Sequence, residues 1–457
     1  MQNSSKADIV ICGAGIAGVA AAYHLCVRHG IENVVLVDER PPLSLTSDKS
    51  TECYRNWWPG PDDAMAALGN RSIDLLEALA QTSANAFGMN RRGYLFATAN
   101  NVAALDRTAR HVAAQGAGPL RVHNGSQGDP EYIPAPPSGY KDLPGGIDLI
   151  HDRALIRRYF PYLCKETRTV AHARRCGWLS AQQLGMTMLD AARARGATLI
   201  SGRMAGVNII GKTVDSVRIE THNGIVDLAT PVLVNAAGPY AGAVNEMLGV
   251  ELPISVEGHV KITFADPRGA MPREAPLVIW TDPVRLPWDA AEARILAQSH
   301  ETRALLEPYA AGVHGRPEGS GNTTLLYWTY APGSNEAIFP VPHDPAYPEI
   351  VLRGMSVMLP ALAAYFGQQP KPYIDGGYYT KTPENRPLIG PLPLQGAYIC
   401  SAFSGFGIMM SMAAGELLAA HVAGSARPAY APAFAPSRYD DPGYRKRLAD
   451  WPDNCEL

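Results

Sequence analysis

The sequence predicts an α/β protein in which a parallel-sheet unit is interleaved with a second, mostly antiparallel β domain. Three observations predict this class. A glycine-rich turn joins a buried strand to a helix near the N-terminus, a second helix–strand–hairpin–strand order occupies 186–238, and short strand-like runs alternate with loops over 251–374. With 457 residues the chain is too long for one simple core, so two domains are expected.

Composition excludes several classes of protein. Charged residues make up 18% and hydrophobic residues 46%, as in an ordinary globular chain. A net charge of −3 argues against nucleic acid as the main partner. The seven cysteines form no C-x-x-C pair, which argues against a zinc site or a disulfide framework and fits a reducing compartment. No other pattern of residues indicates a metal site. The apolar N-terminal run contains three spaced glycines, so we expect a strand, turn and helix without a membrane span, and a cytoplasmic location.

The first unit reads as strand, helix and strand. Residues 7–12 form a short β-branched run, 19–28 a helix of small residues that Gly30 ends, and 33–38 a second buried strand. Between the first strand and the helix lies the G-x-G-x-x-G motif of Gly13, Gly15 and Gly18.

This context makes the glycine motif specific for a dinucleotide. Gly13 permits the tight turn, Gly15 lets the backbone approach a pyrophosphate, and Gly18 lets the helix pack closely on the sheet. The helix N-terminus offers N–H groups and partial positive charge to the phosphates. Asp38, 20 positions after Gly18, can accept hydrogen bonds from the ribose hydroxyls, with Glu39 the adjacent candidate. The motif alone does not decide between FAD and NAD.

The later elements follow in order. A helix is expected over 186–195, with Gly196 ending it, then a strand, a hairpin that turns at Asn223-Gly224, and a strand into 235–238. Residues 97–147 are rich in loops, and 251–374 form the antiparallel part, with an insertion near 285–320. A further strand, "AYICSAF", leads into a glycine-rich turn and an apolar helix, and the Pro-rich segment 425–457 is expected at the surface.

Four segments together resemble the D-amino-acid oxidase-like (DAO) superfamily of FAD-dependent oxidoreductases, which includes glycine oxidase, sarcosine oxidase and the dimethylglycine dehydrogenases. They are "VICGAGIAGVAAAYHL" with "VLVDE", "AARARGATLISGRMAGV", "VLVNAAGPYA", and "GGYYTKTPENRPLIGP" followed by "SAFSGFGIMMSMAAGELLA". The resemblance implies a Rossmann-like FAD-binding domain of the glutathione-reductase type. We expect it to comprise 1–95, 148–250 and 375–424, with a substrate domain of 96–147 and 251–374 and a C-terminal tail of 425–457.

The resemblance also assigns the cofactor-binding residues. The loop of Gly13, Ala14, Gly15, Ile16, Ala17 and Gly18 would hold the ADP half together with Asp38, Glu39 and Arg40. Val207 would contact the adenine side through its backbone, and Ala237-Gly238 would pass close to the dinucleotide. Gly405, Phe406, Gly407, Ile408 and Met409 would lie at the flavin, where backbone N–H groups stabilise the negative charge of the reduced ring.

The segment "STECYRNWWPG" would form the near wall of the flavin through Ser50, Thr51 and Cys53. In dimethylglycine dehydrogenase-like members a "GSTWH" histidine is bonded to the flavin, and in this alignment Cys53 takes its place. Covalent attachment at Cys53 is therefore one hypothesis, and a buried, unreactive cysteine is the other.

Both substrate clamps of the superfamily are replaced in this chain. Tyr379 stands where glycine oxidase-type members hold the substrate carboxylate with an arginine, and Met409 stands where sarcosine oxidases use a lysine. Gly377 stands where sarcosine oxidases attach the flavin through a cysteine. These losses argue against simple α-amino acids and favour a bulkier or less charged amine. Arg55 is then the nearest cation for a substrate anion or the flavin.

The segment "EGHVKITF" supplies two further candidates. Strand alternation would place His259 and Lys261 on one face. His259 is a candidate for proton transfer, and Lys261 for assisting oxygen activation, although a solvated strand lysine is the commoner case. Tyr378, Tyr379, Tyr327 and Trp328 can form an aromatic wall around an amine, or simply pack in the core.

The functional hypothesis is an FAD-dependent oxidoreductase that oxidises the C–N bond of an amine or amino-acid derivative by hydride transfer to flavin N5. Oxygen or another electron acceptor would reoxidise the flavin. Two alternatives stay open: an FAD-dependent, NAD(P)H-using hydroxylase or reductase, and the flavin subunit of a dehydrogenase complex.

Overall fold

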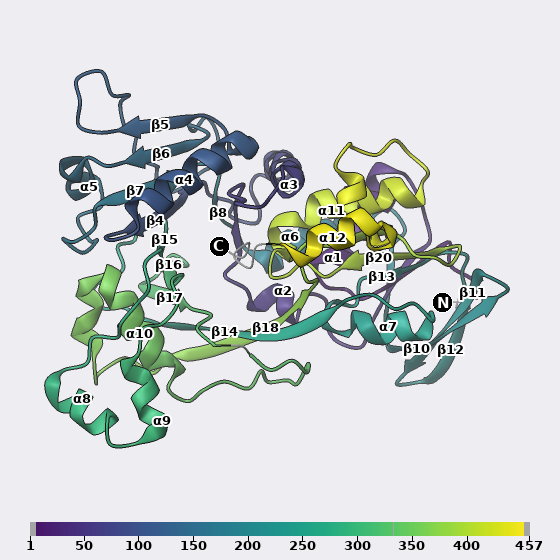
Figure 1. The fold of residues 1–457 in the computed structure, drawn as a ribbon. Helices are drawn as coiled ribbons and strands as arrows, with labels where there is room; N and C mark the ends of the chain where they lie inside the picture. Colours follow the sequence, from purple (N-terminus) through teal and green to yellow (C-terminus); the bar gives the residue numbers. More distant parts are fainter. Residues whose placement is uncertain (1–5, 332, 452–457) are drawn as a thin grey trace.

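Two large sheets organise the chain (Figure 1). The computed structural model describes residues 6–331 and 333–451. The first sheet has six strands in the order β19 (Leu388–Pro391), β20 (Ala397–Ser401), β13 (Leu233–Asn235), β1 (Ile9–Cys12), β2 (Val34–Asp38) and β9 (Thr198–Ser201). Its neighbouring strands are parallel, except that β19 runs antiparallel to β20.

The parallel sheet is buried on both faces, and its alternating side chains explain why. Ile9 and Ile11 point into one apolar core, and Val35 and Val37 into another. The first core is shared with four helices that pack on one another: α1 (Ile16–Tyr23), α3 (Ala64–Thr82), α6 (Ala181–Arg193) and α11 (Gly407–Val422). A three-stranded antiparallel sheet covers the other face: β10 (Arg203–Ile210), β11 (Thr213–Thr221) and β12 (Gly224–Ala229). A strand buried on both faces needs a continuous apolar run, which β1 and β2 provide.

The second sheet has nine strands and is mostly antiparallel. Their order is β18 (Tyr373–Lys381), β14 (Ser255–Ala265), β17 (Thr323–Tyr327), β16 (His314–Glu318), β15 (Leu277–Trp280), β4 (Tyr94–Thr98), β7 (Thr169–Ala173), β6 (Ile147–Ile150) and β5 (Leu120–His123). Helix α10 (Tyr347–Met358) packs on one face, and α4 (Val102–Val112) on the other.

Strands β14 and β18 connect the two parts of the molecule. They pair antiparallel from Ser255 opposite Lys381 to Thr263 opposite Tyr373, and Figure 1 shows them running from the nine-stranded sheet toward the parallel sheet. The short helix α2 (Thr46–Lys49) packs against β18. This arrangement carries β18 from the antiparallel part to the edge of the first unit.

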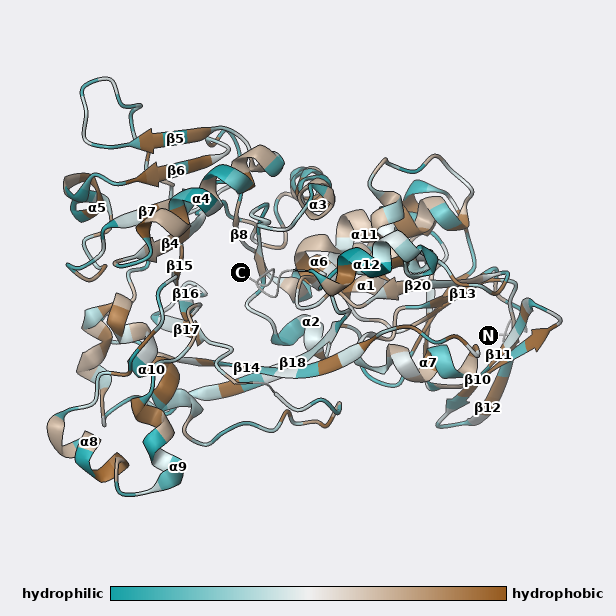
Figure 2. Ribbon diagram, viewed as in Figure 1, coloured by the Kyte–Doolittle hydropathy of each residue, from teal (hydrophilic) through white to brown (hydrophobic). Residues whose placement is uncertain are grey.

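The remaining strands and α-helices are shorter. They are β3 (Cys53–Tyr54) paired with β8 (Gly177–Trp178), and the helices α5 (Arg153–Tyr159), α7 (Ala241–Met247), α8 (Ala290–Leu296), α9 (His300–Arg303) and α12 (Pro442–Ala449). Figure 2 shows a hydrophilic α12 near a largely apolar α11. Within the part of the chain that the structure describes, no helix is both long and apolar enough to cross a membrane.

The fold class predicted from the sequence is confirmed, with differences in detail. The hairpin turns where expected, between Thr221 and Gly224. Helix α6 begins at Ala181, earlier than the expected residue 186, because the Ser180 side chain caps it. The nine-stranded sheet contains β6, β7 and β18, although the expected boundaries assigned 148–250 and 375–424 to the other unit.

The expectation of a surface tail is wrong for residues 434–438. Phe434 is fully buried, and its carbonyl accepts the N–H of Ile389 at 2.9 Å. The Arg438 guanidinium is buried against the Glu384 carboxylate, with Nε 2.8 Å from Oε1. The Pro-rich and charged composition suggested exposure, but a buried aromatic side chain and a paired buried charge hold this part of the segment against the fold. Residues 452–457 of the expected tail lie outside the described residues.

Candidate functional site

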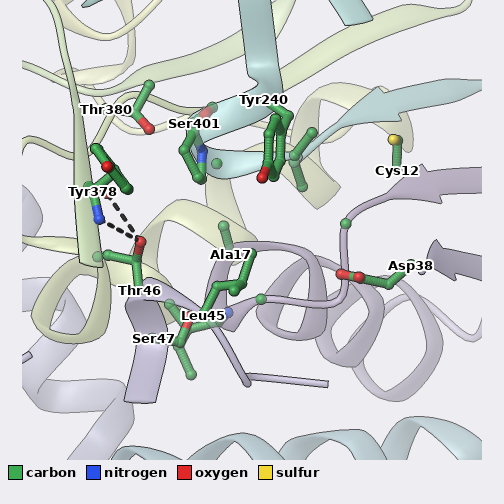
Figure 3. A pocket seen from close by; sticks show the side chains of 18 of the residues that line it. Cys12, Ala17, Asp38, Leu45, Thr46, Ser47, Tyr240, Tyr378, Thr380 and Ser401 are labelled. Carbon is green, nitrogen blue, oxygen red and sulfur yellow. Dashed lines mark hydrogen bonds between the residues drawn. The ribbon is translucent and has the colours of Figure 1, made fainter. Parts of the chain in front are cut away.

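A cavity of about 400 Å³ runs from the carboxyl ends of β1 and β2 to the start of α11 (Figure 3). At one end it is lined by Gly13, Gly15, Ile16, Ala17 and by Asp38, Glu39 and Arg40. Ala237 and Gly238 also line it, as do Gly405, Gly407 and Ile408 at the start of α11. Ligands bind at such strand ends in open α/β sheets.

The glycine turn fits the close approach that a dinucleotide requires. Gly13 has φ +108°, and a Cβ atom there would overlap the carbonyl of Ala236 on β13's end. A Cβ on Gly18 would overlap the carbonyl oxygen of Gly13, so Gly18 serves helix–strand packing and does not line the cavity. The fully buried Ala14 also lies behind the cavity wall.

Asp38 is fixed at the end of β2 by the same turn. Its Oδ2 accepts the N–H of Ala14 at 2.8 Å, and its Oδ1 accepts the N–H of Arg40 at 3.0 Å. The carboxylate lies on the cavity wall, where ribose hydroxyls can donate to its remaining lone pairs. The side chains of Glu39 and Arg40 are partly exposed and 3.8 Å apart, which places them at the rim.

The sequence did not indicate the segment 43–47, which also lines this cavity. Ser47 accepts the N–H of Ile16 at 2.9 Å, at the first turn of α1. Thr46 accepts the N–H of Tyr378 at 3.1 Å and donates to its carbonyl at 3.0 Å (Figure 3). These contacts tie α2 to both the glycine turn and β18. Hydroxyl-rich "SLTS" is too common a string to indicate a site by itself.

A second cavity, of about 620 Å³, meets the first at Tyr379, Ser404 and Gly405, which line both. Its walls include the aromatic residues Trp57, Tyr94, Phe96, Trp280, Tyr327, Trp328 and Phe406. A Cβ on Gly405 would lie 2.5 Å from the Tyr379 ring, so only glycine lets that ring pack against the backbone at the junction. A cavity of this size accommodates a small organic substrate.

Arg55 brings a buried cation to the second cavity. The residue is 3% exposed, and its guanidinium lies 4.8 Å from the ring centre of Trp58 and 5.4 Å from that of Phe406. Aromatic faces hold a guanidinium by cation–π attraction. Because Phe406 follows the shared residue Gly405, Arg55 stands near the junction of the cavities.

Tyr379 is the predicted substrate-side residue that the structure places at the junction. Behind it, the His259 ring stacks on the Tyr379 ring with centres 3.9 Å apart. His259 itself lines neither cavity. Of the other three predicted aromatic residues, Tyr327 and Trp328 line the second cavity and Tyr378 the first.

Lys261 shares a face with His259, as strand alternation predicted. The β14–β18 register sets His259 opposite Gly377 and Lys261 opposite Asp375. Lys261 Nζ lies 3.8 Å from Asp375 Oδ2, and burial lowers the pKa of Lys261. It lines neither cavity, so the structure gives it no direct contact with the cofactor or substrate space.

Four of the other predicted cofactor contacts line one cavity or the other. Phe406 and Met409 line the second cavity, as does Thr51, whereas Ser50 lines the first. Val207 lines neither, because β10 leaves the cavity after its first residues. Arg203 and Met204 take that position, about 10 Å earlier along the strand.

Cys53 is also absent from both cavity walls. It is 4% exposed, belongs to an apolar core, and donates its S–H to the carbonyl of Thr51 at 3.2 Å. Burial raises the pKa of the Cys53 thiol, so the reactive thiolate is disfavoured. The structure therefore supports the hypothesis of a buried, unreactive cysteine.

We expect acid precipitation to release all of the flavin from the purified protein. The reason is that Cys53 has neither the position nor the ionisation state for attack on the ring. The measurement is the flavin absorbance of supernatant and pellet. A yellow pellet that turns colourless in Cys53→Ser would contradict this expectation.

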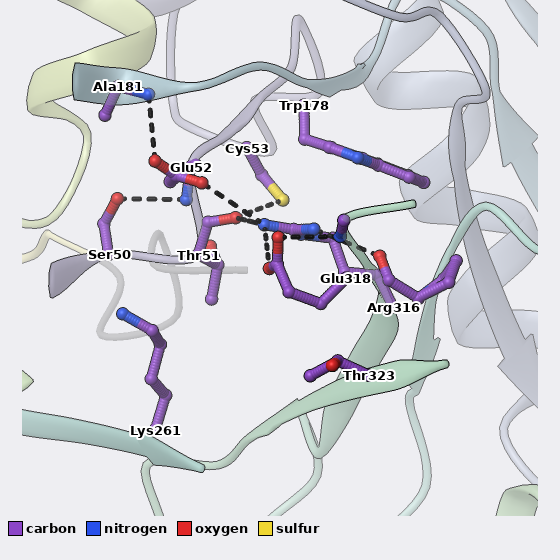
Figure 4. Close-up of polar contacts among 12 residues, drawn as sticks. Ser50, Thr51, Glu52, Cys53, Trp178, Ala181, Lys261, Arg316, Glu318 and Thr323 are labelled. Atoms are coloured by element: carbon purple, nitrogen blue, oxygen red, sulfur yellow. Dashed lines mark hydrogen bonds and ion pairs between the residues drawn. The ribbon is translucent and has the colours of Figure 1, made fainter. Parts of the chain in front are cut away.

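Arg316 holds the segment that carries Thr51 and Arg55 (Figure 4). It is fully buried on β16, and its Nε and Nη2 donate to the Thr51 carbonyl at 3.0 and 2.8 Å. Its charge is balanced by Glu318, 2.8 Å away, and by Glu52 at 3.7 Å. Nothing in "HGRPEG" shows which distant segment this arginine meets, so the sequence did not indicate it.

His314 was missed for the same reason. It lines the second cavity next to Tyr327, with ring centres 4.8 Å apart, and its Nδ1 contacts the Gly312 carbonyl at 2.8 Å. Burial lowers the pKa of His314 to about 4, so it is neutral at physiological pH. Among residues 6–331 and 333–451, no group of three or more His, Cys, Asp or Glu side chains is arranged to hold a metal ion.

A glycine turn and an acidic residue at the strand ends, beside a second cavity that could take a small molecule, are typical of a dinucleotide-dependent oxidoreductase. The chain belongs to the DAO family, described as FAD dependent oxidoreductase, whose sequence model matches residues 8–421. The cofactor is therefore FAD, and the glycine turn, Asp38 and the open strand ends described above fit its ADP half. No curated protein sequence matches the chain significantly.

Solved structures of similar fold cover nearly the whole chain. L-proline dehydrogenase from P. horikoshii superposes with a TM-score of 0.70 at 21% identity, covering 95% of this chain and 98% of that one. Glycine oxidase from Geobacillus kaustophilus gives a TM-score of 0.70 at 17% identity, covering 94% and 98%. Iminodiacetate oxidase from Chelativorans sp. BNC1 gives 0.66 at 20%, also covering 94% and 98%. At these identities the likeness concerns the fold.

Proposed function

We propose that this enzyme oxidises the C–N bond of a bulky amine or amino-acid derivative. One observation carries the proposal: the aromatic second cavity joins the FAD cavity at Tyr379, Ser404 and Gly405. A substrate that fills the second cavity can thus present one carbon to the cofactor. A cavity of about 620 Å³ is much larger than a substrate such as glycine needs, so most of its aromatic wall would be left without contacts.

The chain's own residues would bind and orient the substrate. When bound, FAD supplies the oxidation by accepting a hydride at N5 from the carbon attached to nitrogen. The aromatic walls exclude water and contact the apolar part of the substrate, which fixes its orientation. Arg55 attracts an anionic group such as a carboxylate at the junction. With FAD bound, the backbone N–H groups at the start of α11 would favour negative charge on the flavin.

Two lines support an amine substrate that carries a carboxylate. The similar structures named above are a proline dehydrogenase and oxidases of glycine and iminodiacetate. The substrates in these names are all small amines that carry a carboxylate. In this chain Tyr379 and Met409 replace the two clamp positions, but Arg55 brings a guanidinium from another segment. A charged substrate end is therefore compatible with this site. The acceptor that reoxidises FAD is oxygen or an electron-carrying partner.

The test is anaerobic mixing of the FAD-loaded protein with a panel of amines, with flavin absorbance as the readout. The panel contains glycine, L-proline, iminodiacetate, both enantiomers of phenylalanine and tryptophan, and their N-methyl derivatives. We expect a bulky member to bleach the flavin at least about 10-fold faster than glycine, because it alone fills the aromatic cavity. Bleaching by NADPH with no response to any amine would instead identify a hydroxylase or reductase. Bleaching that requires a second protein would identify a subunit of a dehydrogenase complex.

A further inference from the structure

Three side chains form a row behind the junction of the two cavities: the Glu257 carboxylate, the His259 imidazole and the Tyr327 phenol. Tyr327 on β17 has its hydroxyl 2.7 Å from Nδ1 of His259 on β14. Nε2 of the same ring lies 3.1 Å from Oε1 of Glu257, two residues earlier on β14. Of these three side chains, only Tyr327 lines the second cavity.

The three groups span the distance from the cavity toward solvent. Tyr327 and His259 are 9% and 6% exposed, whereas the Glu257 side chain is 25% exposed. Glu257 also contacts Lys381, whose Nζ lies 3.1 Å from its Oε2. The contact with His259, and then the charge of Lys381, lowers the pKa of Glu257 to about 2, so this carboxylate stays ionised.

The proton positions follow from these partners. An ionised carboxylate only accepts hydrogen bonds, so a ring proton on Nε2 of His259 can point at Glu257. Nε2 makes no well-directed hydrogen bond in this conformation, although the carboxylate is within reach. Nδ1 is then the acceptor for the Tyr327 hydroxyl. Thr329 donates to the Tyr327 oxygen at 2.9 Å and helps to orient it.

The other titratable groups near His259 and Tyr327 have their own contacts. Lys261, on the same strand as His259, is paired with Asp375. His314 faces Tyr327 from β16, but its Nδ1 is taken by Gly312 and its lowered pKa keeps it neutral. Tyr379, on β18, stacks on His259, and its hydroxyl lies 3.4 Å from that of Tyr327.

The proposed reaction needs a proton acceptor at this place. At neutral pH an alkylamine is an ammonium ion, and its nitrogen must lose a proton before the lone pair can assist hydride loss from the neighbouring carbon. Burial raises the pKa of Tyr327 well above 10, so the phenol cannot act as a standing base. The Tyr327 hydroxyl can accept a proton only if it gives its own proton to a base that is hydrogen-bonded to it.

We propose that Tyr327, His259 and Glu257 form a proton relay that deprotonates the substrate ammonium, a role that rests on the proposed function. The Tyr327 oxygen takes a proton from the ammonium as its own proton moves to Nδ1 of His259. One N–H bond and one O–H bond break, one O–H and one N–H bond form, and no electrons leave the relay. The resulting imidazolium is stabilised by Glu257, and after the product leaves it returns its Nδ1 proton through Tyr327 to water in the emptied cavity, which restores the starting tautomer. Tyr327 is the catalytic residue, and His259 and Glu257 act through it.

The test measures the rate of flavin reduction against pH, with the panel amine that bleaches the wild-type protein fastest. At about pH 7 we expect Tyr327→Phe to lower the rate about 10²-fold, and Glu257→Gln to lower it less. Near pH 10 both variants should approach the wild-type rate, because an amine that is already neutral needs no relay. Tyr398→Phe, on β20 and lining neither cavity, is the matched control.

A merely structural role predicts a different pattern. If Tyr327→Phe loses the same factor at every pH, or keeps the wild-type profile, the relay is wrong while the proposed function stands. If no amine bleaches the wild-type protein, the proposed function fails and the relay with it.

A second readout does not depend on turnover. In protein labelled with ¹⁵N-histidine, NMR should show His259 as the Nε2–H tautomer, and Tyr327→Phe should shift its Nδ1 signal. His259→Gln assigns the resonance. An Nδ1–H tautomer would overturn the proposed direction of transfer.

Discussion

Gly13→Ala is expected to yield a folded protein that has lost nearly all of its FAD. The new methyl group would overlap the Ala236 carbonyl at the end of β13, and φ of +108° is strained for any residue with a Cβ. The turn must therefore move away from the position in which it meets the pyrophosphate. Strain and displacement together cost roughly 3–5 kcal/mol, which lowers the affinity for FAD more than about 100-fold. The measurement is the ratio of flavin to protein absorbance after purification, followed by titration of FAD into the apoprotein.

The matched control is Gly211→Ala. Gly211 also has a positive φ, +64°, but it lies between β10 and β11 with nothing within 4 Å of a Cβ. This variant should keep a full complement of FAD, since its strain is remote from the cavity. Circular dichroism of both variants shows whether each has folded. A folded Gly13→Ala protein that retains wild-type FAD content would remove the glycine turn from the cofactor site.

The N-terminal part of this site was predictable because its parts are local in sequence. The turn, the first helix and Asp38 all lie within 40 residues, and each has a single physical reason for its identity. Alternating cores on β1 and β2 follow from the same rule, that a parallel strand is buried on both faces. Where spacing along one strand decides the outcome, as for His259 and Lys261, the prediction was also confirmed.

The other parts of the site depend on contacts between segments that are distant in the sequence. Alternation shows that two side chains share a face, but not whether that face reaches a cavity, so His259 proved to lie behind Tyr379. The contact between Arg316 and the Thr51 carbonyl joins residues 265 positions apart. Val207 lies outside the cavity that Arg203 and Met204 line, and a shift of a few residues along β10 moves a side chain about 10 Å. Tertiary packing determines all three positions, and no local sequence pattern predicts that packing.

Arg55→Gln is expected to raise the KM for a carboxylate-bearing amine and to leave FAD content unchanged. Glutamine keeps some hydrogen-bonding capacity but removes the charge that stands beside Phe406 at the junction. A charge-assisted hydrogen bond inside a protein contributes about 2–3 kcal/mol, so kcat/KM should fall on the order of 100-fold. The measurement is the amine concentration dependence of flavin reduction, with the best amine of the panel and with the amide of its carboxylate.

The amide makes this prediction specific to charge. An uncharged amide has little to lose when Arg55 is replaced, so the wild-type preference for acid over amide should nearly disappear in the variant. Arg110→Gln, on the exposed face of α4 and paired with Asp106, is the control for a changed arginine far from the cavity. If Arg55→Gln loses FAD and keeps its acid-to-amide preference, the guanidinium serves the flavin. The other reading of Arg55 from the sequence would then be correct, and the substrate would need no anion.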